Sequence, residues 1–232
     1  MSADTQAVFE KIYALGLWGK ADGMPYFSGS GSHDPRIVDP YVECIKQYFS
    51  MFRHFYGRLP DVIDLGCGDF SVGSRIQPLT RKYTALDAVP SLIEYNKNRF
   101  SSLPVTFVAA DAKEYSYPSV DIVMVRQVFQ HLPNANIAAI LGRIAGAAQH
   151  LIITEHLPAH DGFVPNAEIP AVGSWRLSIY SGVQVTQPPF SLGVVDERQL
   201  CVCEESGGRI VTTAFRLPTC KDVVKAPSLL SR

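Results

Sequence analysis

The sequence predicts an α/β fold, namely a doubly wound, mostly parallel seven-stranded sheet with an antiparallel last hairpin and an N-terminal helical lid. Short apolar runs alternate with helix-like segments between residues 61 and 155, which is the pattern of repeated βαβ units. Two alternating segments near the end are joined by a turn that contains Gly207 and Gly208, which favours a hairpin. We therefore expect an N-terminal helical extension and lid (1–60), a main domain (61–218) and a C-terminal tail (219–232).

Composition and charge limit the classes of partner. Of 232 residues, 47% are hydrophobic and 19% are charged, so a sizeable core is expected. The formal net charge of -1 gives no electrostatic case for binding nucleic acid or an anionic membrane surface. No apolar run approaches the ~20 residues of a membrane-spanning helix, and the first residues lack a signal-peptide pattern. The 5 cysteines are odd in number and lack framework spacing, which favours reduced thiols and a cytoplasmic location.

The N-terminal extension combines two helices with an aromatic, glycine-rich connection. Apolar residues recur at helical spacing in two segments, 5–15 and 35–55. The Ser-Gly-Ser-Gly-Ser stretch between them has the composition of a flexible linker. Trp18, Tyr26 and His33 flank this stretch, however, and aromatic residues beside glycines suit a lid that covers and binds a substrate. For His33, a position beside Asp34 at the start of the second helix is the alternative.

The main domain is organised around residues 61–73. The short apolar run of Val62 and Ile63 with Leu65 is typical of a buried parallel strand. Gly66 and Gly68 follow it and permit a tight turn in which the backbone approaches a ligand closely. A helix over 71–79 points its free N–H groups back at this ligand. A strand, a glycine turn and a helix start together predict a nucleotide-type cradle.

The remaining elements follow from the same alternation. We expect further strands over 83–86, 105–109, 120–125, 150–154, 199–203 and 209–216, and further helices over 90–99 and 136–149. The segment 157–197 lacks a helical period and is rich in proline and glycine. Loops of this length in compact domains are commonly functional, so we expect a long ordered excursion there.

Acidic residues stand at the ends of three consecutive predicted strands. Asp64 precedes Gly66 by two residues, and Asp87 and Asp111 follow the next two strands. Because the carboxyl ends of parallel strands meet at the same edge of a sheet, we expect the three carboxylates to converge on one ligand.

This order of motifs resembles the class I S-adenosylmethionine-dependent methyltransferases of the small-molecule type, which have a Rossmann-like sheet. The resemblance implies that Asp64, Gly66 and Gly68 face the methionine part of S-adenosylmethionine. It also implies that Asp87 binds the ribose hydroxyls and that Asp111 accepts from the adenine amino group.

Other positions add to the resemblance or depart from it. Ala112 adjoins the adenine-side acid. Arg126 and Gln127 follow the fourth strand, where the backbone of the family holds the amino group of the cofactor. Phe70 stands in place of a third glycine, so its ring is expected to narrow the turn or to cover the methionine tail. The extension as a whole resembles a bacterial subset with N-terminal Trp-Gly and Ser-Gly-x-Gly-Ser elements.

A dinucleotide is the competing cofactor. Its fingerprint needs a third glycine three residues after the second, and Ser71 stands there. A carboxylate beside a pyrophosphate is repulsive, whereas a carboxylate beside a sulfonium and an ammonium is attractive. Asp64 and Asp111 therefore favour S-adenosylmethionine over a nicotinamide cofactor.

The acceptor is expected beside the cofactor, over the ends of the fourth and fifth strands. His131 is the first candidate general base because histidine titrates near neutrality, although it also suits fixing the loop or capping the next helix. Glu155 and His156 are further candidates, with a surface ion pair as the alternative. Arg176 and Arg126 suit an anionic group of the acceptor, or an ion pair with Glu155.

We therefore expect methyl transfer to an oxygen or nitrogen of a small-molecule acceptor, such as a sugar or a specialised metabolite, by in-line attack in a lidded pocket. The alternatives are a nicotinamide-dependent oxidoreductase and a non-catalytic cofactor-binding protein of the same fold. No metal site is expected, because the acids are assigned to the cofactor. No nucleic-acid or membrane partner is expected, and a monomer and a homodimer both remain open.

Overall fold

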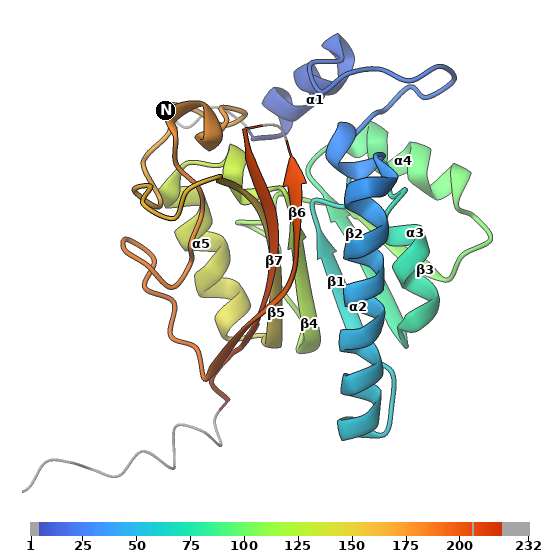
Figure 1. The fold of residues 1–232 in the computed structure, drawn as a ribbon. Helices are drawn as coiled ribbons and strands as arrows, with labels where there is room; N and C mark the ends of the chain where they lie inside the picture. Colours follow the sequence, from blue (N-terminus) through green and yellow to red (C-terminus); the bar gives the residue numbers. More distant parts are fainter. Residues whose placement is uncertain (1–4, 206, 220–232) are drawn as a thin grey trace, which may run out of the picture.

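The computed structural model describes residues 5–205 and 207–219. Seven strands form one sheet in the order β3-β2-β1-β4-β5-β7-β6, and β7 is antiparallel to both of its neighbours (Figure 1). The strands are β1 (Asp61–Leu65), β2 (Lys82–Asp87), β3 (Val105–Ala109), β4 (Val120–Arg126), β5 (Ala148–Pro158), β6 (Asp196–Glu205) and β7 (Gly208–Arg216). The predicted fold class and its antiparallel last hairpin are confirmed. The predicted tail from residue 220 onward, with Cys220, lies outside the described residues.

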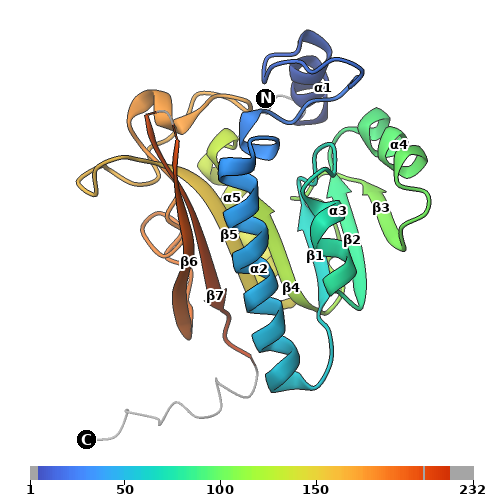
Figure 2. The ribbon, with the colours of Figure 1, turned by 45° about the vertical axis from the view of Figure 1, so that its right-hand side comes forward.

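Helices cover both faces of the sheet (Figures 1 and 2). They are α1 (Thr5–Leu15), α2 (Pro35–Tyr56), α3 (Gly73–Ile76), α4 (Pro90–Arg99) and α5 (Asn134–Ala145). On the face opposite α5, α2 and α3 pack against the sheet. The connection between α1 and α2 lies with α1 above the carboxyl ends of the parallel strands (Figure 2).

Successive strand residues point alternately into two cores. Val62 and Ile122 pack in the core beneath α2, whereas Ile63 and Val123 pack in the core beneath α5. A parallel strand that is buried on both faces must be apolar between its ends, as residues 62–63 of β1 and 122–125 of β4 are. Polar side chains can then gather only where the strands end, which places the site at that edge of the sheet.

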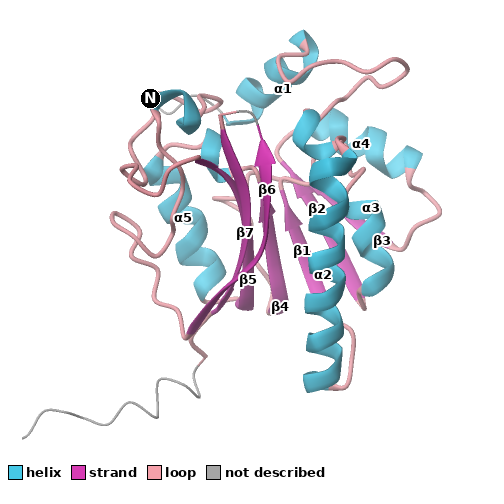
Figure 3. Ribbon diagram, in the orientation of Figure 1, coloured by secondary structure: helices cyan, strands magenta, loops and turns pink. Residues whose placement is uncertain are grey.

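The expected excursion is present between β5 and β6. It contains a 3₁₀ turn, Arg176–Ile179, and is otherwise loop (Figure 3). Val172, Val183 and Val185 from this segment are buried in the same core as α5. Ordered loop thus covers part of the sheet where the resembling family usually places a helix.

Two predicted helix boundaries are wrong. The helix expected from residue 71 begins at Gly73, because the N–H of Ser71 donates to the side chain of Asp69 within the turn (3.0 Å). The helix expected over 136–149 spans Asn134–Ala145. Ala148 already pairs with Val120, so strand pairing ends the helix before Gly146.

The described residues also bear on membrane-spanning helices, metal sites and disulfides. Within the described residues, no helix is both long enough and apolar enough to cross a membrane. No group of three or more histidine, cysteine or acidic residues suited to a metal ion occurs in the same ranges. The four described cysteines are free thiols.

Candidate active site

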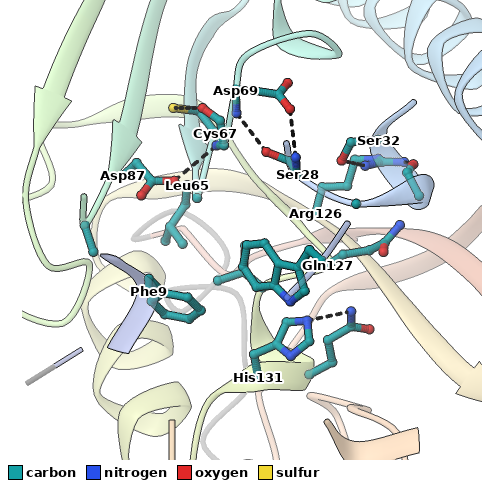
Figure 4. Close-up of a pocket in the computed structure, with 18 of the residues that line it drawn as sticks. Phe9, Ser28, Ser32, Leu65, Cys67, Asp69, Asp87, Arg126, Gln127 and His131 are labelled. Carbon is teal, nitrogen blue, oxygen red and sulfur yellow. Dashed lines mark hydrogen bonds between the residues drawn. The ribbon is translucent and has the colours of Figure 1, made fainter. Parts of the chain in front are cut away.

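A cavity of about 560 Å³ lies at the carboxyl ends of β1, β2 and β4 (Figure 4). Its other walls come from α1 and from the segment 16–33, which we call the lid. The chain runs from β1 outward to β2 and β3 on one side, and from β4 outward to β5 on the other. Open α/β sheets bind their ligands at such a switch in strand order.

The turn after β1 leaves no room for side chains at its two glycines. Gly66 and Gly68 have φ of 72° and 55°, which favours glycine. A Cβ on Gly66 would lie 2.4 Å from Val128, and one on Gly68 would lie 2.5 Å from the hydroxyl of Ser28. The turn is therefore packed directly against the lid and against the loop that follows β4.

Phe70 does not line the cavity, so the expectation that its ring covers the methionine tail is wrong. Its backbone has φ of 60°, the left-handed conformation of the glycine that it replaces. The ring is fully buried in the core beneath α2, where its centroid lies 5.5 Å from that of Tyr83, 5.1 Å from that of Phe100 and 5.0 Å from that of Phe107. Phe129, the second aromatic residue near a strand end, is likewise buried in a core rather than in the cavity wall.

Asp64 and Asp87 are buried carboxylates at the cavity wall. Asp64 accepts from the hydroxyl of Tyr83 (2.8 Å), and Asp87 accepts from the N–H groups of Gly68 and Val89 (both 3.1 Å). Burial raises the pKa of each to about 6. Within the described chain, neither carboxylate forms an ion pair, so both favour a ligand that brings hydroxyl donors or positive charge.

Asp111 and Ala112 also line the cavity, beyond the end of β3. The Asp111 carboxylate accepts from the N–H of Lys113 (3.0 Å) and pairs with the ammonium of the same residue. A ligand amino group would share this carboxylate with Lys113.

Arg126 and Gln127 end β4 beneath the lid. Arg126 donates to the hydroxyl of Ser32 (3.2 Å) and to the carbonyl of Gly31, and its guanidinium lies 4.8 Å from the ring centroid of Tyr41. Gln127 has φ of 55°, a conformation that a non-glycine residue adopts at a cost and that is enriched at functional sites. Its side-chain Nε2 is buried and has no hydrogen-bond partner within the described residues.

His131 lines the cavity but uses both ring nitrogens within the protein. Burial lowers its pKa to about 4, so the ring is neutral near pH 7. Nδ1 lies 3.3 Å from the carbonyl of Ser174, so in the neutral ring Nδ1–H donates to this carbonyl. Nε2 then accepts from the side-chain amide of Gln130 (3.2 Å). This arrangement matches the loop-fixing alternative better than a free general base.

Glu155 and Arg176 face away from the cavity. Glu155 accepts from the N–H groups of Phe129 (3.1 Å) and Gln130 (2.8 Å), and burial raises its pKa to about 8. Arg176 is fully buried and donates to three carbonyls and one amide oxygen, those of Phe129, Leu132, Ala167 and Asn134. We therefore assign both residues to fixing the loop after β4. Glu155 is no longer a candidate for catalysis, and Arg176 is no longer a candidate for binding the acceptor.

His156 lies at the cavity with one ring nitrogen unpaired within the described residues. Its side chain lines the cavity, 5.7 Å from the ring centroid of Trp175. Its Nε2 is buried and has no hydrogen-bond partner among the residues that the structure describes. Burial lowers the pKa of His156, which favours the neutral ring with one nitrogen free to accept a proton.

The lid places one of its three predicted aromatic residues in the cavity. Trp18 lines it and lies 5.4 Å from His131, centroid to centroid. Tyr26 packs outside, between Tyr13 (5.6 Å) and a tyrosine of α4 (5.4 Å). His33 stacks on Phe27 at 4.4 Å, also outside the cavity wall. We therefore withdraw the assignment of Tyr26 and His33 to substrate binding.

A family model described as a methyltransferase domain matches residues 62–149. Over these residues the chain is similar to methyltransferases. The matched region runs from β1 to the start of β5 and so includes the glycine turn and the acids Asp64, Asp87 and Asp111. It leaves out the lid and His156.

Solved structures share the fold of this chain. The N-methyltransferase NodS from Bradyrhizobium japonicum WM9, in complex with S-adenosyl-L-homocysteine, is 15% identical and has a TM-score of 0.65, with 94% of this chain and 100% of that chain covered. The magnesium protoporphyrin IX methyltransferase ChlM from Synechocystis PCC 6803, with bound SAM, is 15% identical and has a TM-score of 0.58, with 93% and 98% covered. A comparison with curated proteins gave no match.

Other residues of the cavity were not predicted from sequence. They are Tyr13, Asp69 and Gln130. An acid inside the glycine turn is a signal that would have indicated Asp69. Tyr13 gave no comparable signal, because a tyrosine on an amphipathic helix is more often part of a core.

Glu155 is expected to make the stability of the domain depend on pH. Its pKa of about 8 in the folded protein exceeds that of an exposed glutamate, so between these values the folded state holds a proton that the unfolded state has released. The free energy of unfolding should therefore fall by about 1–2 kcal/mol as the pH rises from ~6.5 to ~8. Denaturant titrations should show this fall in the parent protein and a smaller one in Glu155→Gln. Equal slopes would mean that Glu155 does not titrate in this range.

Arg176 is expected to contribute strongly to stability. Arg176→Met leaves three buried carbonyls without their donor, at about 1 kcal/mol or more each, so unfolding should become easier by about 3 kcal/mol. The matched control is Arg143→Met, because Arg143 is 44% exposed and makes a loose ion pair of 3.7 Å. Its expected effect is below about 0.5 kcal/mol. A similar loss for the two variants in urea titrations would refute the role of Arg176.

Proposed function

We propose that this protein transfers the methyl group of S-adenosylmethionine to an oxygen or nitrogen of a small, uncharged acceptor. The observation that carries the proposal is the pair of buried carboxylates, Asp64 and Asp87, on either side of the glycine turn at a cavity wall. The matched methyltransferase domain and the neighbours solved with SAM or S-adenosyl-L-homocysteine support the choice of cofactor.

The residues present fit this cofactor better than a dinucleotide. S-adenosylmethionine supplies an electrophilic methyl group on a positively charged sulfur. Asp64 would hold the methionine part, Asp87 the ribose hydroxyls, and Asp111 the adenine side. Asp69 adds another acid at the same turn, 1% exposed. A pyrophosphate on this turn would be repelled by Asp64, Asp69 and Asp87, whereas a cation would be attracted.

The rest of the cavity suits an acceptor without charge. Of the three charged candidates for this wall, Glu155 and Arg176 point into the protein. Arg126 lines the cavity, but its guanidinium donates to Gly31 and Ser32 of the lid. Gln127 and His156, both in the cavity lining, each have a buried nitrogen without a partner among the described residues. Trp18 and Trp175 supply aromatic surface. Unpaired buried polar groups select a ligand that satisfies them. We infer that His156 accepts the proton that an acceptor hydroxyl or amine loses.

Calorimetry and a turnover assay test this proposal in two steps. S-adenosylmethionine and S-adenosylhomocysteine should bind and NAD should not, whereas tighter binding of NAD would overturn the cofactor assignment. Neutral hydroxyl and amine compounds should then give methylated products by mass spectrometry, and matched carboxylates and phosphates should not. Binding of S-adenosylhomocysteine with no turnover across such a set would favour a non-catalytic protein.

A further inference from the structure

Asp69 joins the lid to the glycine turn. One oxygen of its carboxylate, Oδ2, accepts from the N–H of Ser28 (2.9 Å) and lies 2.7 Å from Nε2 of His33. The N–H of Asp69 in turn donates to the hydroxyl of Ser28 (2.9 Å). Figure 4 shows Asp69 and Ser28 facing each other at the cavity wall. These contacts connect residues 41 and 36 positions apart in the chain, so they do not belong to the local turn.

The Asp69 carboxylate is ionised and committed to these partners. Burial alone would raise its pKa, but hydrogen bonds from Ser71 and His33 outweigh burial and lower the pKa. Oδ1 accepts from the N–H of Ser71 (3.0 Å), while Oδ2 serves Ser28 and His33. Such charge-assisted bonds are roughly twice as strong as neutral ones. We call Ser28, His33 and Asp69 the latch.

Arg126 holds the lid at a second point, and the lid carries Trp18 on the acceptor side. Arg126 donates to Gly31 and Ser32, between the two lid residues of the latch. The hydroxyl of Ser28 lies 3.2 Å from that of Tyr13, whose ring contacts the edge of Trp18 at 5.2 Å. The latch is thus connected by direct contacts to the tryptophan that lines the acceptor side.

We propose that Asp69 is a positioning residue that holds the lid closed over the cofactor and sets Trp18 against the acceptor. A ligand that is enclosed by the lid enters and leaves when Ser28 and His33 separate from Asp69. Lids that gate the release of ligands in this way often limit turnover. The identity of the ligand rests on the proposed function, whereas the latch itself rests on the contacts within the chain.

Hydrogen exchange of the ligand-free protein tests the latch directly. Asp69→Asn keeps the side-chain shape but replaces one acceptor oxygen with an NH₂ group, so Ser28 or Ser71 loses its acceptor. Backbone amides over 19–33 should exchange at least ~10-fold faster, with amides of β4 and β5 unchanged. Asp34→Asn is the matched control, because Asp34 caps α2 without contacting Asp69 and asparagine caps equally well. Exchange over 19–33 within twofold of the parent would overturn the proposal.

Ligand release gives a second readout. The chain has 2 tryptophans, Trp18 and Trp175, so the fluorescence of a Trp175→Phe background reports Trp18. Dissociation of S-adenosylhomocysteine should be at least ~10-fold faster in Asp69→Asn than in the parent. Dissociation from His33→Gln, which keeps a hydrogen-bond donor, should be slower than dissociation from His33→Ala. Unchanged dissociation in all three would refute the gating role.

The outcomes separate the latch from the proposed function. If the parent protein does not bind S-adenosylhomocysteine, the proposed function fails, and hydrogen exchange still decides whether the latch holds the lid. If Asp69→Asn does not fold, His33→Ala removes one arm of the latch without altering the glycine turn. Faster exchange over 19–33 in that variant supports the latch, and unchanged exchange rejects it.

Discussion

Replacing Asp87 with alanine is expected to weaken the binding of S-adenosylhomocysteine by at least ~100-fold. Asp87 is buried at the end of β2 and lines the cavity, and its two oxygens accept from the N–H groups of Gly68 and Val89. Two ligand hydroxyls bound to the remaining lone pairs would contribute about 1.5–3 kcal/mol each, and 2.7 kcal/mol corresponds to about 100-fold. Isothermal titration calorimetry measures the change.

Two controls make the Asp87 result specific. Asp61→Ala removes an equal charge at the opposite end of β1, where Asp61 pairs with Arg81, and should leave affinity within about twofold. Asp87→Asn keeps one acceptor oxygen and should lose less affinity than alanine. Circular dichroism should show an unchanged fold for all three. Unchanged affinity in Asp87→Ala would contradict the ribose assignment and remove the main support for the cofactor.

The sheet could be predicted because its signals are local. The run before Gly66 is apolar on both faces, and a chain that alternates such runs with helices has few ways to fold. The acids Asp64, Asp87 and Asp111 could be placed at one edge for the same reason, since parallel strands end together. All three line the cavity in the structure.

The roles of individual side chains could not be predicted, because they depend on partners far away in the sequence. Arg176 bonds to the carbonyl of Phe129, 47 positions away, and Asp69 bonds to Ser28, 41 positions away. An arginine before a loop looks the same in the sequence whether it faces a substrate or a row of carbonyls. For Phe70, the departure from the glycine pattern was visible in the sequence. The direction of its ring was not, because the core beneath α2 sets it.

The same limit applied to the candidate bases, which lie close together in sequence and differ only in their surroundings. Glu155 and His156 are adjacent on β5, so their side chains point to opposite faces of the strand. Glu155 meets backbone N–H groups, whereas His156 meets the cavity. His131 reaches the same cavity with both nitrogens engaged. Only the geometry of the loop after β4 separates these residues.

Replacing His156 with glutamine is therefore expected to lower kcat by at least ~100-fold while the affinity for S-adenosylhomocysteine stays within about threefold. General-base catalysis by a positioned side chain typically contributes about 10²–10⁴-fold, and a residue on the acceptor side has no bond to the cofactor to lose. His150→Gln is the matched control. His150 lies on the same strand but hydrogen-bonds Tyr48 (2.9 Å) away from the cavity, so turnover should change little.

The pH profile distinguishes a base from a residue that merely shapes the pocket. His156 must be neutral to accept a proton, and burial lowers its pKa below the ordinary value of 6.5. The assay uses saturating S-adenosylmethionine, so that the titration of Asp64 and Asp87, with pKa of about 6, does not enter. In the parent enzyme kcat/KM for the acceptor should then rise with pH through a midpoint below 6.5 and stay level above it. This ascending limb should disappear in His156→Gln, because glutamine does not titrate, and should persist in His131→Gln. If the limb persists in His156→Gln and vanishes in His131→Gln, then His131 is the base, and its hydrogen bond from Gln130 must break during each turnover.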